Sequence, residues 1–445
     1  MGRIRGGRRG ERRNRRRGPV SAAALGLSSV LVLVPALGGC GTGAEGSGGV
    51  TLTVVATNYG DDVVKNSESY WNRIDTAFEA AHPGISLDVR VYDPGEAEAQ
   101  VAKMVAAGDP PDIAQISGYA DYAAKGDLYQ ADDLLSIRVQ ANFLPNLVDA
   151  GSAGHTQYGL PFLASTRLLY VNKTLFAEAG LEPPTTWAEL RNAAQVLDER
   201  GVKYPYALPL GPEEAQAETL QWLLGGGGGY TGDTGEYDIA SPRNISTLTW
   251  LRDRMVGDGL TGPVSPDRLN RKAALRAFVD GEAGMVSAPG ALVREIGRSV
   301  EPVAYEAVPM PGRTAGVTTA TVGTSDWIAA FKHRGHAEEI GTYLNFLYED
   351  KNMVDLAGTY QLLPVTSSAA TSMRANKTYE SLWDGLDALG AAQLYPIGKP
   401  TWTATSRDIQ ETIGGAVLER GSPAKVLGAI QRGAAAAEAA EAEAE

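Results

Sequence analysis

The sequence predicts an α/β fold built as two lobes, and three observations lead to this prediction. Strand-like and helix-like segments alternate along the body of the chain, which is typical of a mostly parallel sheet covered by helices. About 400 residues follow an N-terminal leader, more than a single hydrophobic core usually organises. A second alternating series begins near Leu160, so each half of the body is expected to form one lobe.

The first lobe is predicted from a strand–helix–strand–helix–strand series. Its strand-like segments are rich in β-branched residues or alternate between apolar and polar residues. Its helix-like segments carry apolar residues three and four positions apart, as at Trp71, Ile74 and Phe78. In chain order these segments are residues 50–57, 69–81, 85–92, 97–107 and 112–116.

The remainder of the body continues the alternation. Thr186 and Glu189 have the spacing of a capping box, which predicts a helix beginning at Trp187. Further strands are expected at residues 168–171, 283–287 and 326–331, and further helices at 245–256, 272–279 and 338–348. The expected parts are an N-terminal lobe of residues 50–161 and 320–364, a C-terminal lobe of residues 162–319 and 365–432, and a frayed helical tail at 433–445.

Residues 1–39 have the layout of an export signal. Nine arginines precede an apolar run at residues 22–37. The 16 residues of this run are fewer than the roughly 20 that a membrane-spanning helix needs. The paired arginines leave both the general secretory and the twin-arginine export routes open.

Cys40 follows this segment and is the only cysteine in the chain, so it cannot form an intramolecular disulfide. An unpaired buried cysteine is one interpretation. The sequence Leu37-Gly38-Gly39-Cys40, however, resembles the lipobox of bacterial lipoproteins, in which the cysteine is acylated and becomes the mature N-terminus. We therefore expect a lipid (palmitate) on Cys40, anchoring in the cell membrane on the extracellular side, and a flexible tether at residues 40–49.

The charge of the chain bears on its partners. The full sequence carries a net charge of −13, and without residues 1–39 it has 31 basic and 52 acidic residues, a net charge of −21. Such a surface repels phosphate backbones. The composition therefore disfavours a nucleic-acid partner.

Six short motifs occur in an order that resembles the family 1 extracellular solute-binding proteins, the group that includes maltose-binding protein. The motifs are residues 106–113 (AAGDPPDI), 158–161 (YGLP), 169–176 (LYVNKTLF), 179–190 (AGLEPPTTWAEL), 278–285 (FVDGEAGM) and 362–365 (LLPV). The likeness extends from about residue 52 to residue 430.

This resemblance implies a periplasmic-binding-protein-like fold, in which three crossings join two α/β lobes and the lobes close over a ligand in the cleft between them. It implies a monomer that binds a small solute, in this group often a sugar, and delivers it to the permease and ATPase of an ABC transporter. It implies no cofactor and no catalysis.

The aromatic candidates for sugar contact are three of the seven tryptophans. Aromatic faces cover the apolar patches of sugars, and polar side chains satisfy the hydroxyls. Trp222, Trp327 and Trp402 are placed by the sequence near glycine-rich or proline-rich segments or a lobe crossing, so each is a candidate. Burial as structural cover is the alternative for each. The other four are expected to be packing residues: Trp71, Trp187, Trp250 and Trp383.

The polar candidates follow the predicted strands, because ligands of open α/β sheets gather at the carboxyl ends of strands. Turn formation is the alternative for two of them, Asn58 and Asp61, and surface solvation is the alternative for Arg167. The full set of polar candidates is Asn58, Tyr59, Asp61, Ser117, Tyr119, Arg167 and Asp326.

Two rival functions remain open. A lipid-anchored glycoside hydrolase would need two carboxylates flanking a bond, whereas the acidic pairs here are adjacent in sequence, as at Glu213-Glu214. The same fold could also bind a solute other than a sugar. Residues 287–291 (SAPGA) lack the aromatic platform that the maltose binder has after this motif, so the resemblance does not extend to maltodextrin. The four histidines have no zinc spacing, and we expect no metal.

Overall fold

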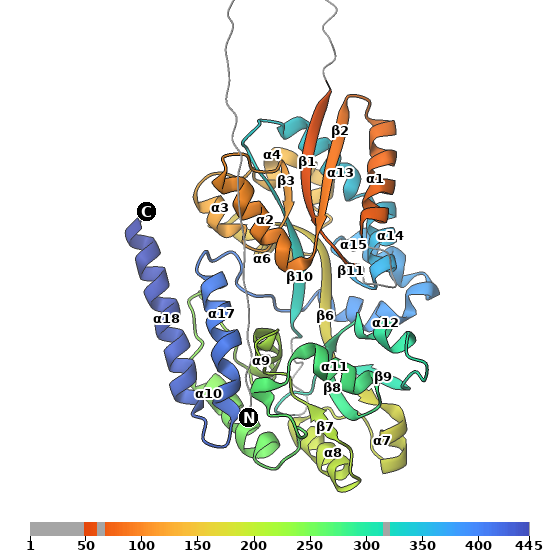
Figure 1. Ribbon diagram of the computed structural model, residues 1–445, viewed down its shortest axis with the longest axis vertical. Coiled ribbons are helices and arrows are strands. Elements are labelled where there is room, and N and C mark those ends of the chain that lie inside the picture. The colour runs from red at the N-terminus through yellow and green to blue at the C-terminus, as the bar shows by residue number, and fades with distance from the viewer. Residues whose placement is uncertain (1–48, 60–66, 315–320, 445) are drawn as a thin grey trace, which may run out of the picture. The chain divides into compact units, whose positions relative to one another are not determined.

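The computed structural model describes residues 49–59, 67–314 and 321–444. The predictions for the leader, for Cys40, for most of the tether and for Asp61 lie outside the described residues. Nine strands form one mixed sheet with the order β2-β1-β3-β10-β6-β8-β7, and β9 and β11 also pair with β6 (Figure 1). The strands are β1 (Val50–Thr57), β2 (Ile85–Tyr92), β3 (Ile113–Gln115), β6 (Leu160–Asn172), β7 (Tyr204–Ala207), β8 (Ala283–Pro289), β9 (Tyr305–Val308), β10 (Gly323–Ala330) and β11 (Leu363–Pro364).

The first lobe contains β1, β2 and β3, which are parallel as the alternating pattern predicts. The helix expected at residues 69–81 is α1, and it buries Trp71, Ile74 and Phe78 against the sheet. The prediction of this core face is confirmed. The larger helices of this lobe are α1 (Glu68–Ala81), α2 (Pro94–Ala106), α13 (Ala337–Leu347) and α14 (Asp350–Tyr360).

The second lobe contains β7, β8 and β9. The capping box is present as predicted, because Thr186 accepts a hydrogen bond from the backbone of Glu189 and the Glu189 carboxylate accepts one from the backbone of Thr186. The larger helices of this lobe are α7 (Lys173–Ala179), α8 (Trp187–Glu199), α9 (Ala215–Gly225), α10 (Pro242–Leu251), α11 (Arg271–Val279), α17 (Trp402–Thr412) and α18 (Pro423–Ala444).

Short elements complete the described chain. They are α3 (Ala120–Ala124), α4 (Ala131–Leu134), α5 (Ile137–Gln140), α6 (Pro145–Ala150), β4 (Ser152–Ala153), β5 (Thr156–Gln157), η1 (Arg252–Val256), η2 (Pro266–Arg268), α12 (Leu292–Gly297), α15 (Ser367–Arg374), η3 (Lys377–Leu382), α16 (Trp383–Leu389) and η4 (Ile413–Val417). Within the described ranges, none of the helices combines the length and the apolar character needed to cross a bilayer.

Strand β6 runs through both lobes. Its first half pairs with β10 and β11, and its second half pairs with β8 and β9. Two further crossings lie beside it. The backbone N–H of Arg167 donates to the carbonyl of Val322 at 3.1 Å, and the N–H of Gln393 donates to the carbonyl of Thr321 at 2.9 Å. The three crossings are therefore hydrogen-bonded side by side, which suits a hinge that bends as one unit.

The third crossing comes later in the chain than the sequence suggested. Helices α15 and α16, with η3 between them, contribute Met373, Leu382 and Leu389 to the core of the first lobe. The segment from 365 to about 392 thus packs on the first lobe instead of beginning the second. The difference arises because these short helices carry too little periodic pattern to show which core they cover.

Helix α18 continues through residues 433–444, where a frayed tail was expected. Alanine favours helix, Ala434 is buried against the second lobe, and Nζ of Lys399 lies 2.6 Å from Oε1 of Glu438. Packing and one ion pair therefore extend the helix into the low-complexity segment.

Candidate ligand-binding cleft

A cavity of about 700 Å³ lies between the two lobes, close to the three crossings. The first lobe contributes residues from α2, from the loop after β3 with α3, and from the start of β10. The second lobe contributes residues from α9, from the 394–397 segment and from α17. Its volume is within the range of small-molecule sites. The loop after β3 stands at the carboxyl end of that strand, where ligands of open sheets bind.

Aromatic rings line both walls of this cavity. Trp402 opens α17 and stacks on Tyr395, with ring centroids 5.4 Å apart and planes inclined by 23°. Trp402 also contacts Tyr230 at a centroid distance of 5.4 Å. On the opposite wall, Trp327 lies in β10 and reaches the cavity although only 1% of it is exposed. Stacked rings beside polar groups are the surface that a sugar face requires.

The wall formed by the first lobe carries carboxylates. Oε1 of Glu98, on α2, accepts hydrogen bonds from the backbone N–H groups of Ser117 at 2.5 Å and Gly118 at 3.1 Å. Burial raises the pKa of Glu98, and these two hydrogen bonds lower it. Burial also raises the pKa of Asp121, whereas the charge of Lys125 lowers it. This wall therefore presents acidic groups at the loop where the sequence predicted Ser117.

Asp326 forms the inner part of the same wall. Its Oδ2 accepts a hydrogen bond from the hydroxyl of Tyr59 at 2.5 Å. Burial raises the pKa of Asp326 to about 6, and the Tyr59 hydrogen bond lowers it. Tyr59 itself stands behind Asp326 and packs against Tyr360, with centroids 5.5 Å apart. Tyr59 thus positions Asp326 and is itself not among the described residues that line the cavity.

Four of the predicted residues line the cavity, namely Ser117, Asp326, Trp327 and Trp402. Asn58 instead organises the start of the loop after β1, because its Oδ1 accepts from the backbone of Ser67 at 3.0 Å and its Nδ2 donates to Asp93 at 3.2 Å. This placement matches the turn-forming alternative.

Two predicted aromatic residues lie in the core instead. Tyr119 is fully buried, and its hydroxyl donates to the carbonyl of Ala150 at 2.8 Å. Trp222 belongs to α9 and not to a loop; it is fully buried, and its ring contacts those of Trp187 and Trp250. The glycine run after Trp222 suggested a loop position, but α9 extends to Gly225 and is buried on nearly every side.

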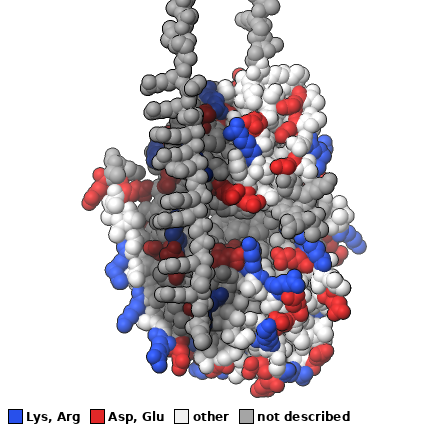
Figure 2. Space-filling view, in the orientation of Figure 1, with Lys and Arg blue, Asp and Glu red and all other residues white. Residues whose placement is uncertain are grey.

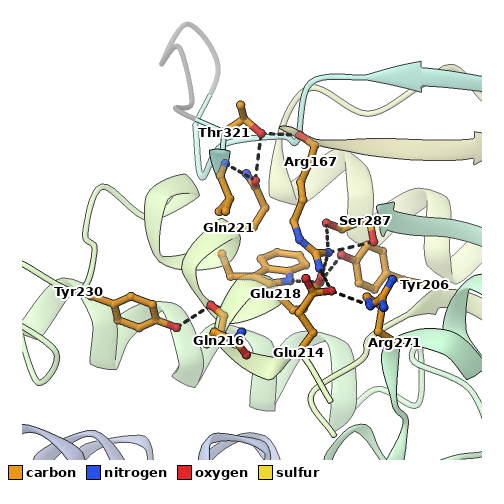
Figure 3. A network of polar contacts seen from close by, with 12 residues as sticks. Arg167, Tyr206, Glu214, Gln216, Glu218, Gln221, Tyr230, Arg271, Ser287 and Thr321 are labelled. Carbon is orange, nitrogen blue, oxygen red and sulfur yellow. Dashed lines mark hydrogen bonds and ion pairs between the residues drawn. The ribbon is translucent and has the colours of Figure 1, made fainter. Parts of the chain in front are cut away.

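Arg167 is buried in an ionic network of the second lobe, not solvated at the surface (Figure 3). Its Nη2 lies 2.7 Å from Glu214, and its Nη1 lies 3.4 Å from Glu218. Glu218 is fully buried and accepts hydrogen bonds from Tyr206 at 2.7 Å and Trp222 at 2.9 Å. A buried charge has to be compensated in this way. The side chain of Arg167 is thus committed to the protein, beside the crossings.

Several cavity residues were not predicted from the sequence. Glu98, Gln216 and Arg407 lie on helices, where a polar residue usually indicates a position that faces solvent. Tyr395 could have been predicted as a cavity residue, since it directly precedes the proline-rich segment 396–403 that contains Trp402.

On the face drawn in Figure 2, acidic and basic side chains of the described residues are interspersed over both lobes.

Two α/β lobes, three adjacent crossings and an aromatic and polar cavity between the lobes define the class of two-lobed solute-binding proteins. The family model described as bacterial extracellular solute-binding protein matches residues 62–354. The chain belongs to this family, and its function is to bind a solute.

Known relatives and structures agree with this assignment. A binding protein from Brucella abortus (strain 2308) is 25% identical over 305 residues, which are 68% of this chain and 74% of the relative. An uncharacterised lipoprotein from Streptomyces antibioticus is 26% identical over 404 residues, 84% of each chain. The crystal structure of the cyclic α-maltosyl-1,6-maltose binding protein from Arthrobacter globiformis has a TM-score of 0.73 at 19% identity, and the match covers 87% of this chain and 99% of that chain. The expected two-lobed fold is confirmed.

Proposed function

We propose that this protein is the extracellular receptor of an ABC importer and that it binds a sugar or oligosaccharide in the cleft. The observation that carries the proposal is Trp402, stacked on Tyr395 in one wall, facing the carboxyl and hydroxyl groups of the other wall. A sugar offers an apolar face to such rings and hydroxyls to such polar groups. The proposed contacts from the predicted set are Ser117, Asp326, Trp327 and Trp402.

The hinge supports capture by closure. A ligand that touches both walls binds the closed arrangement more tightly than the open one, and so shifts the population toward it. The three hydrogen-bonded crossings lie at the base of the cavity and can absorb the rotation. The permease would then recognise the loaded, closed receptor. We propose that the receptor acts as a monomer.

The relatives support the ligand class and the location. The Arthrobacter protein is named as a binder of a cyclic maltosyl maltose, and the Streptomyces relative is named as a lipoprotein. Together with the lipobox-like segment at Cys40, this supports a receptor held at the outer face of the cell membrane by a lipid on Cys40.

Binding without turnover is part of the proposal. A glycoside hydrolase places two carboxyl groups on either side of the scissile bond. Among the described residues that line the cavity, the three carboxylates Glu98, Asp121 and Asp326 all come from the first lobe. The wall contributed by the second lobe holds amide, hydroxyl, aromatic and guanidinium groups. This one-sided arrangement favours a binding role.

A thermal-shift screen tests the proposal. The purified protein is heated with mono- and oligosaccharides, polyols, amino acids and short peptides. A true ligand at about 100 times its dissociation constant adds about 2.7 kcal/mol to the free energy of unfolding, which is a clear rise in melting temperature. Calorimetry then measures the affinity, and chromatography of the recovered ligand checks that it is intact. Stabilisation by peptides or amino acids alone, or product formation at enzymatic rates, would refute the sugar-receptor assignment.

A further inference from the structure

Two backbone N–H groups of the loop after β3 are occupied by a side chain of the protein itself. Ser117 and Gly118 follow β3 at the cavity, and both N–H groups donate to the same oxygen of Glu98. The other carboxylate oxygen, Oε2, also stays close to the loop, because a Cβ placed on Gly118 would lie 3.4 Å from it. Glu98 therefore lies across the loop instead of extending away from it.

This arrangement has a chemical consequence. Backbone N–H groups at the carboxyl end of a strand are the donors with which α/β proteins bind phosphate and carboxylate groups. Here an internal carboxylate already accepts both hydrogen bonds. An anionic ligand would have to displace Glu98 or approach it at close range, and like charges at close range repel strongly where water is partly excluded.

The surrounding charges reinforce this effect. Asp121 lies near enough to Glu98 to raise its pKa, and Asp326 lines the same wall. Two cations also line the cavity. The charge of Lys125 acts on Asp121, and its Nζ lies 5.9 Å from the ring centre of Tyr122. Arg407 stands on α17, on the other lobe. Among the described lining residues, the wall of the first lobe therefore carries three carboxylates and one lysine, which is an excess of negative charge.

We propose that Glu98 determines the charge specificity of this cleft, admitting polyhydroxylated ligands without a negative charge and rejecting their phosphorylated or carboxylated counterparts. A hydroxyl or an amine can donate to the free lone pairs of Glu98, whereas a phosphate cannot. This inference rests on the proposed function, because it specifies which sugars the same cavity accepts. In this mechanism the carboxylate of Glu98 accepts hydrogen bonds from neutral ligands and repels anionic ones, which excludes the anionic class.

The test compares wild-type protein with Glu98→Gln. The amide oxygen of glutamine can still accept the hydrogen bonds of Ser117 and Gly118, so the loop is retained while the negative charge is removed. Calorimetry at pH 7.5 and low salt measures three matched pairs of probes: glucose and glucose 6-phosphate, mannitol and mannitol 1-phosphate, maltose and maltose 1-phosphate. We expect the variant to bind at least one phosphorylated probe about tenfold more tightly than wild type does, so that the ratio of phosphorylated to neutral affinity rises within that pair.

Glu338→Gln is the matched control. Glu338 lies in the first turn of α13, outside the cavity lining, and its replacement changes the net charge equally. This variant should bind the phosphorylated probes with the same affinity as wild type does. Asp121→Asn is the second variant and should give a smaller gain than Glu98→Gln, because no backbone N–H of the loop donates to Asp121 in the described contacts.

The outcomes separate this inference from the proposed function. The inference is overturned if circular dichroism shows that Glu98→Gln is folded and the variant gains no affinity for any phosphorylated probe, whether or not neutral probes bind. Equal gains in Glu98→Gln and Glu338→Gln overturn it as well, since net charge alone would explain them. Failure of wild-type protein to bind any neutral sugar counts against the proposed function only.

Discussion

Nη2 of Arg167 lies 2.7 Å from Oε2 of Glu214, and this ion pair joins a lobe crossing to a cleft helix. Arg167 belongs to β6, which runs through both lobes, whereas Glu214 is the N-cap residue directly before α9. The same helix holds the second crossing, since the side chain of Gln221 accepts from the backbone N–H of Val322 at 2.9 Å. Gln216 of α9 lines the cavity. One helix thus contacts the ligand site and two of the three crossings.

The first prediction concerns the stability of this network. Arg167→Met should destabilise the protein by about 3–5 kcal/mol, because it leaves the fully buried carboxylate of Glu218 without its cation. Urea unfolding followed by circular dichroism measures this change. The control is Arg276→Met, which removes an exposed pair with Asp280 on α11 and should cost no more than about 1 kcal/mol. Equal effects of the two substitutions would mean that the buried network contributes no more to the free energy of unfolding than an exposed ion pair does.

The second prediction separates two tryptophans by their surroundings. Trp402→Ala should weaken sugar binding at least several-fold, because a stacked ring contributes on the order of 1 kcal/mol beyond its buried area. Trp222→Ala should instead lower stability by about 3–5 kcal/mol with little specific loss of affinity, since Trp222 is fully buried among other rings.

The affinities are compared by calorimetry at a temperature at which both variants remain folded. Trp402 is itself 6% exposed and packs on Tyr395, so its removal also costs some stability. The ratio of affinity loss to stability loss therefore distinguishes a ring that contacts the ligand from a ring that only packs in the core. A larger ratio for Trp222→Ala than for Trp402→Ala would reverse the assignment of the two rings.

These two tryptophans also show what the sequence could predict. Local pattern was sufficient for α1, where Trp71 and Phe78 share a face, and for the capping box at Thr186. It failed for α9, because a helix buried on nearly every side has no apolar stripe to reveal it. The position of Trp222 therefore depended on its neighbours in space.

The cleft shows the same limit. The position of Ser117 beside the cavity could be predicted, because the end of a strand is a position that the sequence reveals. The position of Glu98 could not be predicted, since it depends on which loop α2 faces in the fold. The sequence predicted Arg167 as a ligand contact or a solvated surface residue, because its partners Glu214 and Glu218 lie 47 and 51 residues further along the chain. Contacts at such separations require the fold.

The third prediction concerns pH and Asp326. Burial raises the pKa of this carboxyl from 3.8 to about 6 in the folded protein. Its protonated form is therefore favoured by folding, and that contribution is complete below about pH 4 and is lost as the pH rises through 6. Asp326→Asn should remove this dependence. The stability difference between variant and wild type should shift in favour of the variant by up to about 3 kcal/mol from pH 4 to pH 7.

Urea unfolding at several pH values measures the shift. Asp75→Asn is the comparison, because burial also raises the pKa of Asp75, to about 7, on the helix α1 outside the cavity lining. Both substitutions should alter the pH profile of stability, but only Asp326→Asn should also change the pH profile of ligand affinity. A pH-independent difference for Asp326→Asn would show that this carboxyl titrates normally.

The last prediction tests the anchor. Cys40→Ser should release the protein from the membrane fraction into the medium, because the serine hydroxyl cannot replace the thiol that receives the lipid. Immunoblots of the membrane and medium fractions measure the distribution, and metabolic labelling with a palmitate analogue should mark wild type and not the variant. The control is Ser47→Ala in the adjacent tether, which should remain membrane-bound and labelled. Since the substitution leaves every residue of the cavity lining unchanged, the released Cys40→Ser protein should bind ligand with unchanged affinity. A variant that stays in the membrane fraction to the same degree as wild type would show that Cys40 is not the anchor.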